Sequence, residues 1–306
     1  MIFNLTTPVV FIIFNRPDTT FKVFEKIREA KPQKLLIIAD GARFPEELEK
    51  CNKARSVVEH IDWDCEVLTN FSDVNLGCRL RVSSGLDWVF SEVEEAIILE
   101  DDCLPEPSFF GFCQELLEYY RNDTRIMCIS GNNFQFGRRR TLDSYYFSAF
   151  SHCWGWATWR RAWQYYDLEI KLWEIIKDDY WLKNMFHSYH AIKYWKHIFQ
   201  EVYSNLIDTW DYQWFFACCI QSGLTILPNV NLVSNIGFNN DATHTKASDR
   251  LANIPVQSID FPLVHPRFVI RDTQADEFTQ RSVFNSGIFT RIRLKFWHII
   301  ISFKNR

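Results

Sequence analysis

Ala96-Ile-Ile-Leu-Glu-Asp-Asp102 is the stretch that decides the fold of this chain. Its four apolar residues predict a short strand that is buried on both faces, as in a parallel sheet. Three acids follow the strand directly, and Pro105 prevents it from continuing much further. Ligands of parallel sheets bind at the carboxyl ends of the strands, so we expect a functional site at these acids.

Similar apolar runs with polar ends precede this stretch. Residues 8–14 predict a buried strand that ends at Asn15-Arg16-Pro17, and residues 34–39 predict another that ends at Asp40-Gly41. We also expect a strand over 65–69 and helices over 20–30, capped by Asp18 or Thr19, over 45–60 and over 79–91. Strands alternating with helices predict an α/β, Rossmann-like fold with a mostly parallel central sheet flanked by helices.

The second half of the chain has a less regular pattern. We expect a helix over 108–121, a strand over 126–130 and a strand-like run over 224–227. The tryptophan-rich residues 154–163 and the aromatic, charged and helical residues 168–203 are interpreted as a subregion that shapes an acceptor site.

Composition limits the class of protein. The 306 residues are 47% hydrophobic and 24% charged, which indicates a globular chain, and a net charge of -4 gives no basic face for a nucleic acid. The nine cysteines form no Cys-x-x-Cys pair and are odd in number, which favours a reducing compartment. We see no signal peptide and no apolar run of the roughly 20 residues that a membrane span requires. We therefore expect a cytoplasmic protein, and a peripheral position at the inner face of the membrane is compatible with this expectation.

The three acids Glu100, Asp101 and Asp102 indicate a cation site. Adjacent carboxylates in a partly buried place repel one another unless a cation is present. Mn²⁺ or Mg²⁺ prefers oxygen ligands and takes one or two carboxylates alongside substrate phosphates. The alternative is a solvated turn whose acids are incidental, but the buried strand before them and Pro105 after them favour the cation site.

These motifs together resemble a known enzyme family. Residues 96–110, the run Ile126-Met-Cys-Ile-Ser-Gly-Asn-Asn133 and the pair Gly155-Trp156 look like the core of GT-A fold glycosyltransferases. More narrowly, they resemble the N-acetylglucosaminyltransferase I family and related bacterial nucleotide-diphospho-sugar transferases. The likeness spans residues 8–244. It implies a GT-A domain over 1–245, with a helical acceptor-side insertion over 161–205, and a C-terminal extension over 246–306.

The resemblance implies roles for residues at the donor site. Asp102 would bind the metal, and Glu100 and Asp101 would contact ribose or sugar hydroxyls. Arg16 would contact the phosphates, for which a guanidinium is suited, and its alternative is a surface arginine at a loop. Asp40 would pair with the uracil edge, and its alternative is a turn residue before Gly41.

A transfer with inversion also needs a base, because the acceptor hydroxyl loses its proton as it attacks. Asp211, in Thr209-Trp-Asp-Tyr-Gln-Trp214, resembles the family's aspartate between tryptophans, although the family has Trp-Asp-Asp-Trp at this place. Asp208 is the reserve candidate for the base. The alternative for Asp211 is a helix N-cap.

Two further positions match the family loosely. The Gly-, Asn- and Thr-rich residues 231–245 look like a loop that orders over the donor, where His244 would bind the metal or the diphosphate, or is a plain loop histidine. Trp156 would contact donor or acceptor, whereas the other tryptophans near it are expected in the core.

The last residues, 288–306, form a basic and aromatic amphipathic pattern. Such a tail can lie on an anionic membrane surface, or it can dock on its own domain or on a second subunit of a homo-oligomer. The sequence therefore predicts a glycosyltransferase with a nucleotide-sugar donor, such as UDP-N-acetylglucosamine, and a glycan or lipid-linked acceptor. The alternatives are a sugar-nucleotide nucleotidyltransferase, disfavoured because no glycine-rich loop follows the first strand, and a non-catalytic glycan-binding protein.

Overall fold

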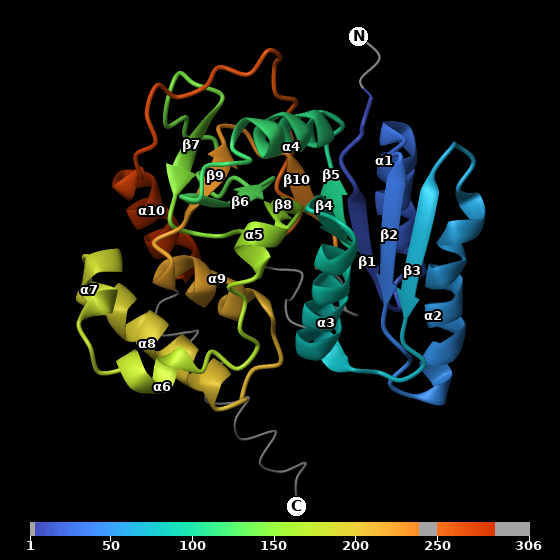
Figure 1. Ribbon diagram of the computed structural model, residues 1–306, viewed down its shortest axis with the longest axis horizontal. Helices are drawn as coiled ribbons and strands as arrows, with labels where there is room; N and C mark the ends of the chain where they lie inside the picture. The colour runs from blue at the N-terminus through green and yellow to red at the C-terminus, as the bar shows by residue number, and fades with distance from the viewer. Residues whose placement is uncertain (1–3, 239–249, 285–306) are drawn as a thin grey trace, which may run out of the picture.

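The computed structural model describes residues 4–238 and 250–284 and is built around one eight-stranded sheet in the order β3-β2-β1-β4-β8-β6-β9-β7 (Figure 1). The first four strands in this order are parallel, with Val9 of β1 opposite Leu35 of β2 and Ile97 of β4. They are β1 (Val9–Ile13), β2 (Lys34–Ala39), β3 (Glu66–Phe71) and β4 (Glu95–Glu100). Each apolar run predicted as a strand in this half forms one.

Helices connect these parallel strands. The connections contain α1 (Pro17–Ala30), the short 3-10 helix η1 (Pro45–Glu47), α2 (Leu48–Arg55), a second 3-10 helix η2 (Ser56–His60) and α3 (Gly77–Glu92). The helix expected over 45–60 is therefore divided into three pieces. Neither Asp18 nor Thr19 caps α1, because the helix begins at Pro17, with Arg16 at its N-cap and no side-chain cap bond. Proline suits this first helical position because it has no N–H to satisfy.

The second half of the sheet is mixed. Strands β6 (Ile126–Ser130) and β9 (Leu224–Pro228) are parallel to each other, whereas β8 (Trp156–Trp159) and β7 (Tyr145–Ser148) run antiparallel to their neighbours. A two-stranded sheet, β5 (Cys103–Pro105) with β10 (Val233–Asn235), lies directly after the acids. The prediction of an α/β fold with a mostly parallel central sheet flanked by helices is confirmed.

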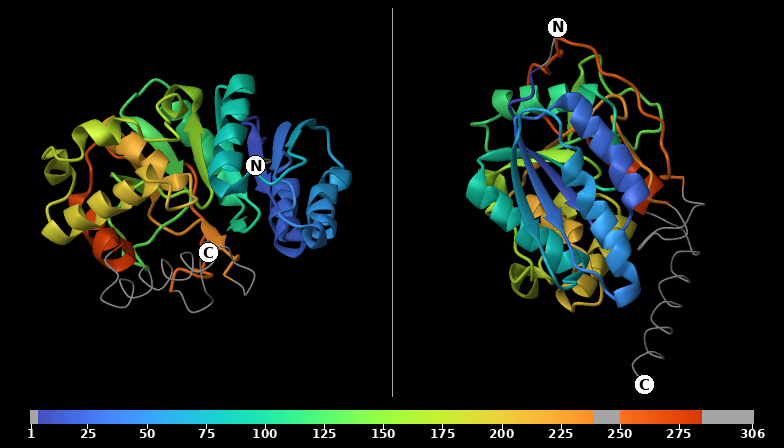
Figure 2. Two further views of the ribbon diagram at one scale, coloured as in Figure 1. Left: turned by 90° about the horizontal axis from the view of Figure 1, so that it is seen from below. Right: turned by 90° about the vertical axis from the view of Figure 1, so that its right-hand side faces the viewer.

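Helices cover both faces of the sheet (Figures 1 and 2). Alternate residues of β1 point to opposite faces: Phe11 packs with α1 and α4 (Ser108–Tyr119), and Val10 packs with α3, α5 (Arg160–Trp163) and α9 (Asp211–Ile220). Both faces are apolar, which is why the strands of this half read as continuous hydrophobic runs.

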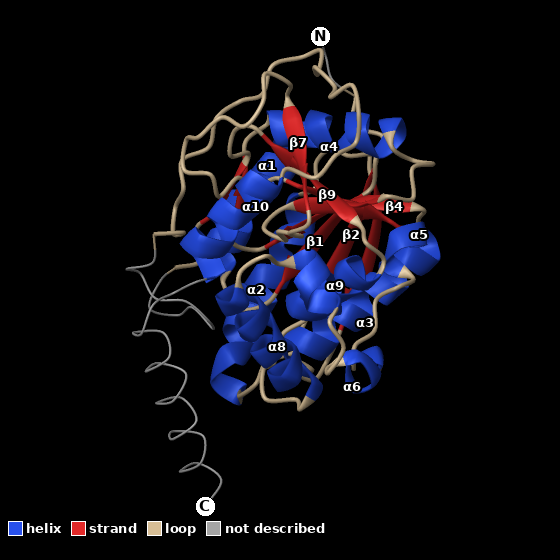
Figure 3. Ribbon diagram, turned by 90° about the vertical axis from the view of Figure 1, so that its left-hand side faces the viewer, coloured by secondary structure: helices blue, strands red, loops and turns tan. Residues whose placement is uncertain are grey.

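A third apolar cluster lies beside the sheet, among the helices of the segment between β8 and β9. It is built on α6 (Leu172–Ile176), α7 (Trp181–Met185), α8 (Tyr189–Tyr203) and part of α9, with Trp195 fully covered at its centre. The last described helices, α10 (Thr273–Thr279) and the π-helix η3 (Gln280–Phe284), pack against α8 and β7 (Figure 3). No helix in the described part of the chain is long and apolar enough to cross a membrane.

Candidate active site

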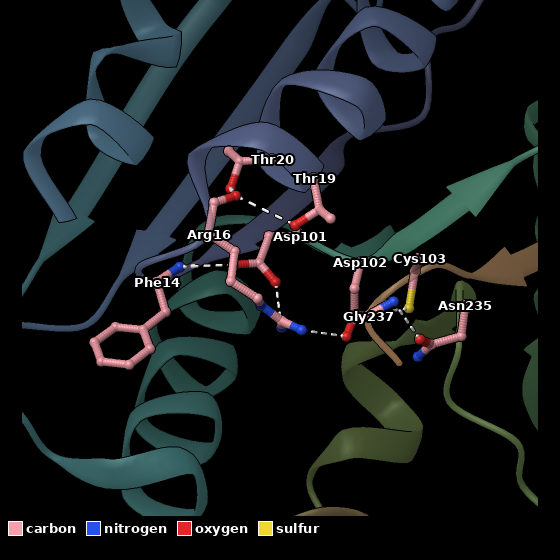
Figure 4. A network of polar contacts seen from close by, with 9 residues as sticks. All are labelled: Phe14, Arg16, Thr19, Thr20, Asp101, Asp102, Cys103, Asn235 and Gly237. Atoms are coloured by element: carbon pink, nitrogen blue, oxygen red, sulfur yellow. Dashed lines mark hydrogen bonds and ion pairs between the residues drawn. The ribbon is translucent and has the colours of Figure 1, made fainter. Parts of the chain in front are cut away.

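An arginine and two aspartates from neighbouring strands meet at one end of the sheet. Arg16 follows β1, and its Nη2 lies 2.5 Å from Oδ1 of Asp101 while its Nη1 lies 2.7 Å from Oδ2 of Asp102 (Figure 4). The backbone N–H of Phe14 donates to the other oxygen of Asp101 at 3.1 Å. Since β1 and β4 are adjacent and parallel, their carboxyl ends place these side chains together.

This cluster has more acid than base. Glu100, Asp101 and Asp102 face one arginine, and burial with the repulsion of the neighbouring acids raises the pKa of Glu100 to about 8. Burial also raises the pKa of Asp101 to about 6, although Arg16 opposes this shift. Burial and the neighbouring acids disfavour the charged forms of these carboxylates, and additional positive charge would favour them. A bound cation would supply that charge.

The strand β10 brings a glycine directly against the cluster. The N–H of Ile236 donates to the carbonyl of Asp102 at 2.8 Å, and the N–H of Gly237 donates to Oδ1 of Asn235 at 2.9 Å. A Cβ added at Gly237 would lie 2.2 Å from Oδ2 of Asp102 and 2.6 Å from Nη1 of Arg16. A larger residue would have to displace one of these two side chains. The sequence interpretation placed residues 231–245 over the donor but did not single out Gly237, for which the only signal was a glycine within a polar loop.

Asp40 lies at the end of β2, where its carboxylate is buried and fully bonded. One oxygen accepts from the N–H groups of Gly41 and Leu76, and the other accepts from the N–H of Gly77 and the side-chain amide of Asn75, at 2.9 to 3.1 Å. These four bonds hold the start of α3 against β2. This placement corresponds to the alternative of a turn residue before Gly41, with no oxygen of Asp40 left free for a base.

The two base candidates take different positions. Asp211 is the first residue of α9. The pKa of Glu100 is raised mainly by burial and by the charges of Asp102 and Asp101, and the charge of Asp211 adds a smaller contribution in the same direction. Asp211 therefore lies at the same end of the sheet as the acids. Asp208 instead accepts from the N–H of Arg79 at 3.0 Å and so caps the first turn of α3.

Cys78, at the start of α3, marks where these acids converge. Burial raises its pKa first, and the charges of Glu100, Asp211, Asp208 and Asp40 raise it further. The charges of Glu100, Asp211, Asp208 and Asp40 therefore all act near Cys78. Glu100 and Asp40 lie at the ends of strands, whereas Asp211 begins α9 and Asp208 precedes it.

Trp156 is placed differently from the prediction of a sugar contact. It lies within β8 with no exposed surface, and its ring packs 5.5 Å from that of Trp210 and 5.7 Å from that of Trp214. A ring enclosed by tryptophans has no face for a ligand, so we assign Trp156 to the core. The sequence could not show this, because β8 inserts antiparallel between β4 and β6. His244 and the tail over 288–306 lie outside the described residues.

The side chains of this site suit a hard divalent cation that shares its ligands with a substrate. Within residues 4–238 and 250–284, no group of three or more His, Cys, Asp or Glu side chains is arranged so that it could hold a metal ion. Asp102 has an oxygen-donor carboxylate, 13% exposed, at the edge of an acid-rich cluster. Such a ligand set fits Mn²⁺ or Mg²⁺, which keeps waters and takes phosphate oxygens.

Comparisons with known proteins add little beyond the fold. The chain matches no protein-family model, and no curated protein sequence matches it. Among solved structures, it is similar to UDP-glucose pyrophosphorylase complexed with UDP-glucose (12% identity, 47% of this chain and 62% of that chain, TM-score 0.27). The match thus spans less than two thirds of the pyrophosphorylase.

Two other solved structures show similar scores. They are 4-diphosphocytidyl-2C-methyl-D-erythritol synthase from Anaerococcus prevotii (11% identity, 56% of this chain and 85% of that chain, TM-score 0.31) and mouse xyloside xylosyltransferase 1 in its apo form (11% identity, 70% and 81%, TM-score 0.30). All three TM-scores are below 0.5, so we draw no functional argument from these likenesses.

Proposed function

We propose that this protein is a metal-dependent glycosyltransferase that takes its sugar from a nucleotide-diphospho-sugar, such as UDP-N-acetylglucosamine. The observation that carries the proposal is the excess of acid over base where β1 and β4 end: among the described residues, three carboxylates gather around one arginine, Arg16. The acceptor in this proposal is a glycan or glycoconjugate, and the nine free cysteines favour a reducing, cytoplasmic setting.

In this proposal Asp102 holds Mn²⁺ or Mg²⁺ together with the diphosphate of the donor. When bound, the cation neutralises charge that develops on the departing nucleoside diphosphate. Arg16, now paired with Asp101 and Asp102, can turn one N–H edge toward the phosphates once the cation takes over part of the acidic charge. Gly237 allows the backbone after β10 to close against these groups.

Asp211 is our candidate for the base that accepts the proton of the acceptor hydroxyl, which would give inversion. It begins α9 beside the tryptophan core, next to Trp210, and the hydroxyl of Thr209 donates to its carboxylate. A carboxylate in this position could accept the proton that the attacking hydroxyl loses. Asp208 is the weaker candidate because it already caps α3.

Ligand-dependent thermal stability tests this proposal. We expect UDP to raise the melting temperature by about 4 °C at roughly 100 times its Kd, but only with Mn²⁺ or Mg²⁺ present. Asp102→Asn is expected to abolish this rise, whereas Asp18→Asn, an exposed acid on α1, should keep it. Each shift is measured against the same variant without ligand, so a change in basal stability does not confuse the result.

The same measurement separates the alternatives. A nucleotidyltransferase would be stabilised by a nucleoside triphosphate and would form a sugar nucleotide from a sugar phosphate. A glycan-binding protein would be stabilised by glycan with no nucleotide or metal. Stabilisation by UDP that is equal with and without metal would overturn the metal-dependent transfer.

A further inference from the structure

Large apolar side chains project from the molecule beside the edge strand β7. Leu142 is 87% exposed, Phe268 67%, Ile270 65% and Val264 56%. They come from two segments, 138–144 and 256–270, that run together beside β7 (Figure 1). The N–H of Ser144 donates to the carbonyl of Val264 at 2.8 Å, and the N–H of Val264 donates to the hydroxyl of Ser144 at 2.9 Å.

Arginines border these apolar side chains. Arg138, Arg139 and Arg267 are exposed, and no carboxylate among the described residues forms an ion pair with any of them. The guanidinium of Arg139 donates to the carbonyl groups of Thr141 and Leu142, at 2.9 and 3.1 Å, which fixes it next to the Leu142 side chain. The ring of Phe278 lies under Arg138, 4.1 Å from its guanidinium carbon.

The two segments carry a surplus of positive charge in a protein that is acidic as a whole. Together they contain four arginines, at 138, 139, 140 and 267, against the two aspartates Asp143 and Asp260, whereas the chain has a net charge of -4. Asp143 is occupied by the hydroxyl of Thr141 at 3.0 Å. Local charge of the opposite sign to the whole chain points to an anionic partner.

We propose that this β7 surface, formed by Leu142, Val264, Phe268 and Ile270 with Arg138, Arg139 and Arg267, docks on an anionic phospholipid membrane. Apolar side chains that project from a surface gain free energy by entering the boundary between headgroups and acyl chains. Arginines at the same level attract lipid phosphates, with guanidinium geometry that suits phosphate oxygens. A phospholipid membrane, with anionic headgroups above an apolar interior, can bind the arginines and the apolar side chains at the same time.

This inference does not rest on the proposed transfer, and it concerns other residues than the tail over 288–306. It assigns membrane contact to the β7 edge of the sheet. There the segment before α10 lies along β7, and Phe147 and Arg271 form a parallel β-bridge. Its test must therefore separate the β7 surface from the tail.

Vesicle co-sedimentation of the full chain provides that test. We expect binding to vesicles of phosphatidylcholine with phosphatidylglycerol, at least tenfold weaker binding to phosphatidylcholine alone, and weakening by salt. Phe268→Ser with Ile270→Ser, and separately Arg138→Glu with Arg139→Glu, are each expected to weaken binding at least tenfold. Circular dichroism and melting temperature confirm that each variant is folded.

Matched controls come from other faces. Ile175→Ser with Tyr180→Ser changes equally exposed apolar residues on α6 and beside α7, and Lys22→Glu with Lys50→Glu reverses two exposed charges on α1 and α2. Both are expected to leave vesicle binding unchanged. A variant of the full chain with Arg291→Gln, Arg293→Gln and Lys295→Gln measures how much the tail contributes to vesicle binding. No vesicle binding, or binding lost in the tail variant and kept in both β7-surface variants, would overturn the proposal.

Discussion

Two of the clusters that pair buried carboxylate with arginine, one at α10 and one at the ends of β1 and β4, differ in their balance of charge. Beneath α10, Asp276 accepts from the hydroxyl of Ser148 at 2.5 Å, from the N–H of Ala149 at 3.0 Å and from Nε of Arg271 at 2.5 Å. Arg271 in turn donates to the carbonyl of Met185 at 2.9 Å. In this cluster one acid pairs with one arginine, and each also forms hydrogen bonds with neighbouring polar groups.

At the ends of β1 and β4 the single Arg16 faces Glu100, Asp101 and Asp102 instead. A balanced, fully bonded pair holds two segments together and leaves no need for a ligand. An unbalanced cluster is stable only with some of its acids neutral or with a cation added. This difference fits a structural role for the first cluster and the proposed ligand-binding role for the second.

The largest expected difference is in turnover. Asp102→Asn is expected to lower the release of UDP from UDP-N-acetylglucosamine by roughly 10³-fold, because a cation's charge stabilisation is worth several kcal/mol. Asp276→Asn, assayed below its own melting temperature, is expected to keep most of the activity. Equal losses in the two variants would erase the distinction between the clusters.

For stability, we expect the larger effect from the cluster at Asp276 and the smaller one from the cluster at Arg16. Asp276→Asn leaves the partly buried Arg271 without its charge partner, and we expect a loss of about 3 kcal/mol in the free energy of unfolding. Asp101→Asn leaves Arg16 paired with Asp102 and removes repulsion, so its cost is expected to stay within about 1 kcal/mol. Urea denaturation at pH 7 measures both, and a larger cost for Asp101→Asn would contradict the account.

His152 supplies a third case, a buried ionisable group with no charge partner. Burial lowers its pKa to about 3, and Nε2 has no hydrogen-bond partner. The unfolded chain takes up this proton below about pH 6.5, so the folded state loses stability as the pH falls from 6.5 toward 3.

From pH 7 to pH 5 this group accounts for about 2 kcal/mol. His152→Phe, in a site already lined by Phe134 and Phe150, is expected to remove that part of the pH dependence. Melting temperatures of both proteins across this pH range provide the check. Parallel curves would show that His152 is not the group responsible.

Gly237→Ala tests the backbone that lies against the acid cluster. The added methyl group must displace Asp102 or Arg16, and we expect a cost of about 1 to 2 kcal/mol in stability together with a weaker metal-dependent response to UDP. Gly137→Ala is the matched control, since a Cβ there meets no atom within 4 Å and only its positive φ opposes the change. A full UDP response in Gly237→Ala would show that the backbone after β10 does not position the cluster.

The sequence predicted the two halves of the sheet unequally, for a physical reason. Residues 9–13, 34–39 and 95–100 are buried on both faces, so their unbroken apolar runs identified β1, β2 and β4 and located Arg16 and the acids after them. Residues 145–148 and 156–159 form antiparallel strands from aromatic segments whose pairing depends on contacts far along the chain. Nothing local distinguishes Trp156, enclosed by tryptophans of α5 and α9, from a tryptophan at a binding site.

The sequence predicted which residues follow a strand and so lie at the candidate site. It did not predict the hydrogen bonds that these residues form. Asp40 follows its strand as expected, but its four hydrogen bonds come from residues 41 and 75–77, whose approach depends on the packing of α3. The close contact of Gly237 likewise depends on the pairing of β10 with β5.

Electron paramagnetic resonance of Mn²⁺ in the presence of UDP tests the central claim most directly. The account predicts that the wild-type and Asp276→Asn proteins each bind one Mn²⁺ when UDP is present, and that Asp102→Asn binds none. One equivalent of Mn²⁺ retained by a folded Asp102→Asn variant would contradict it.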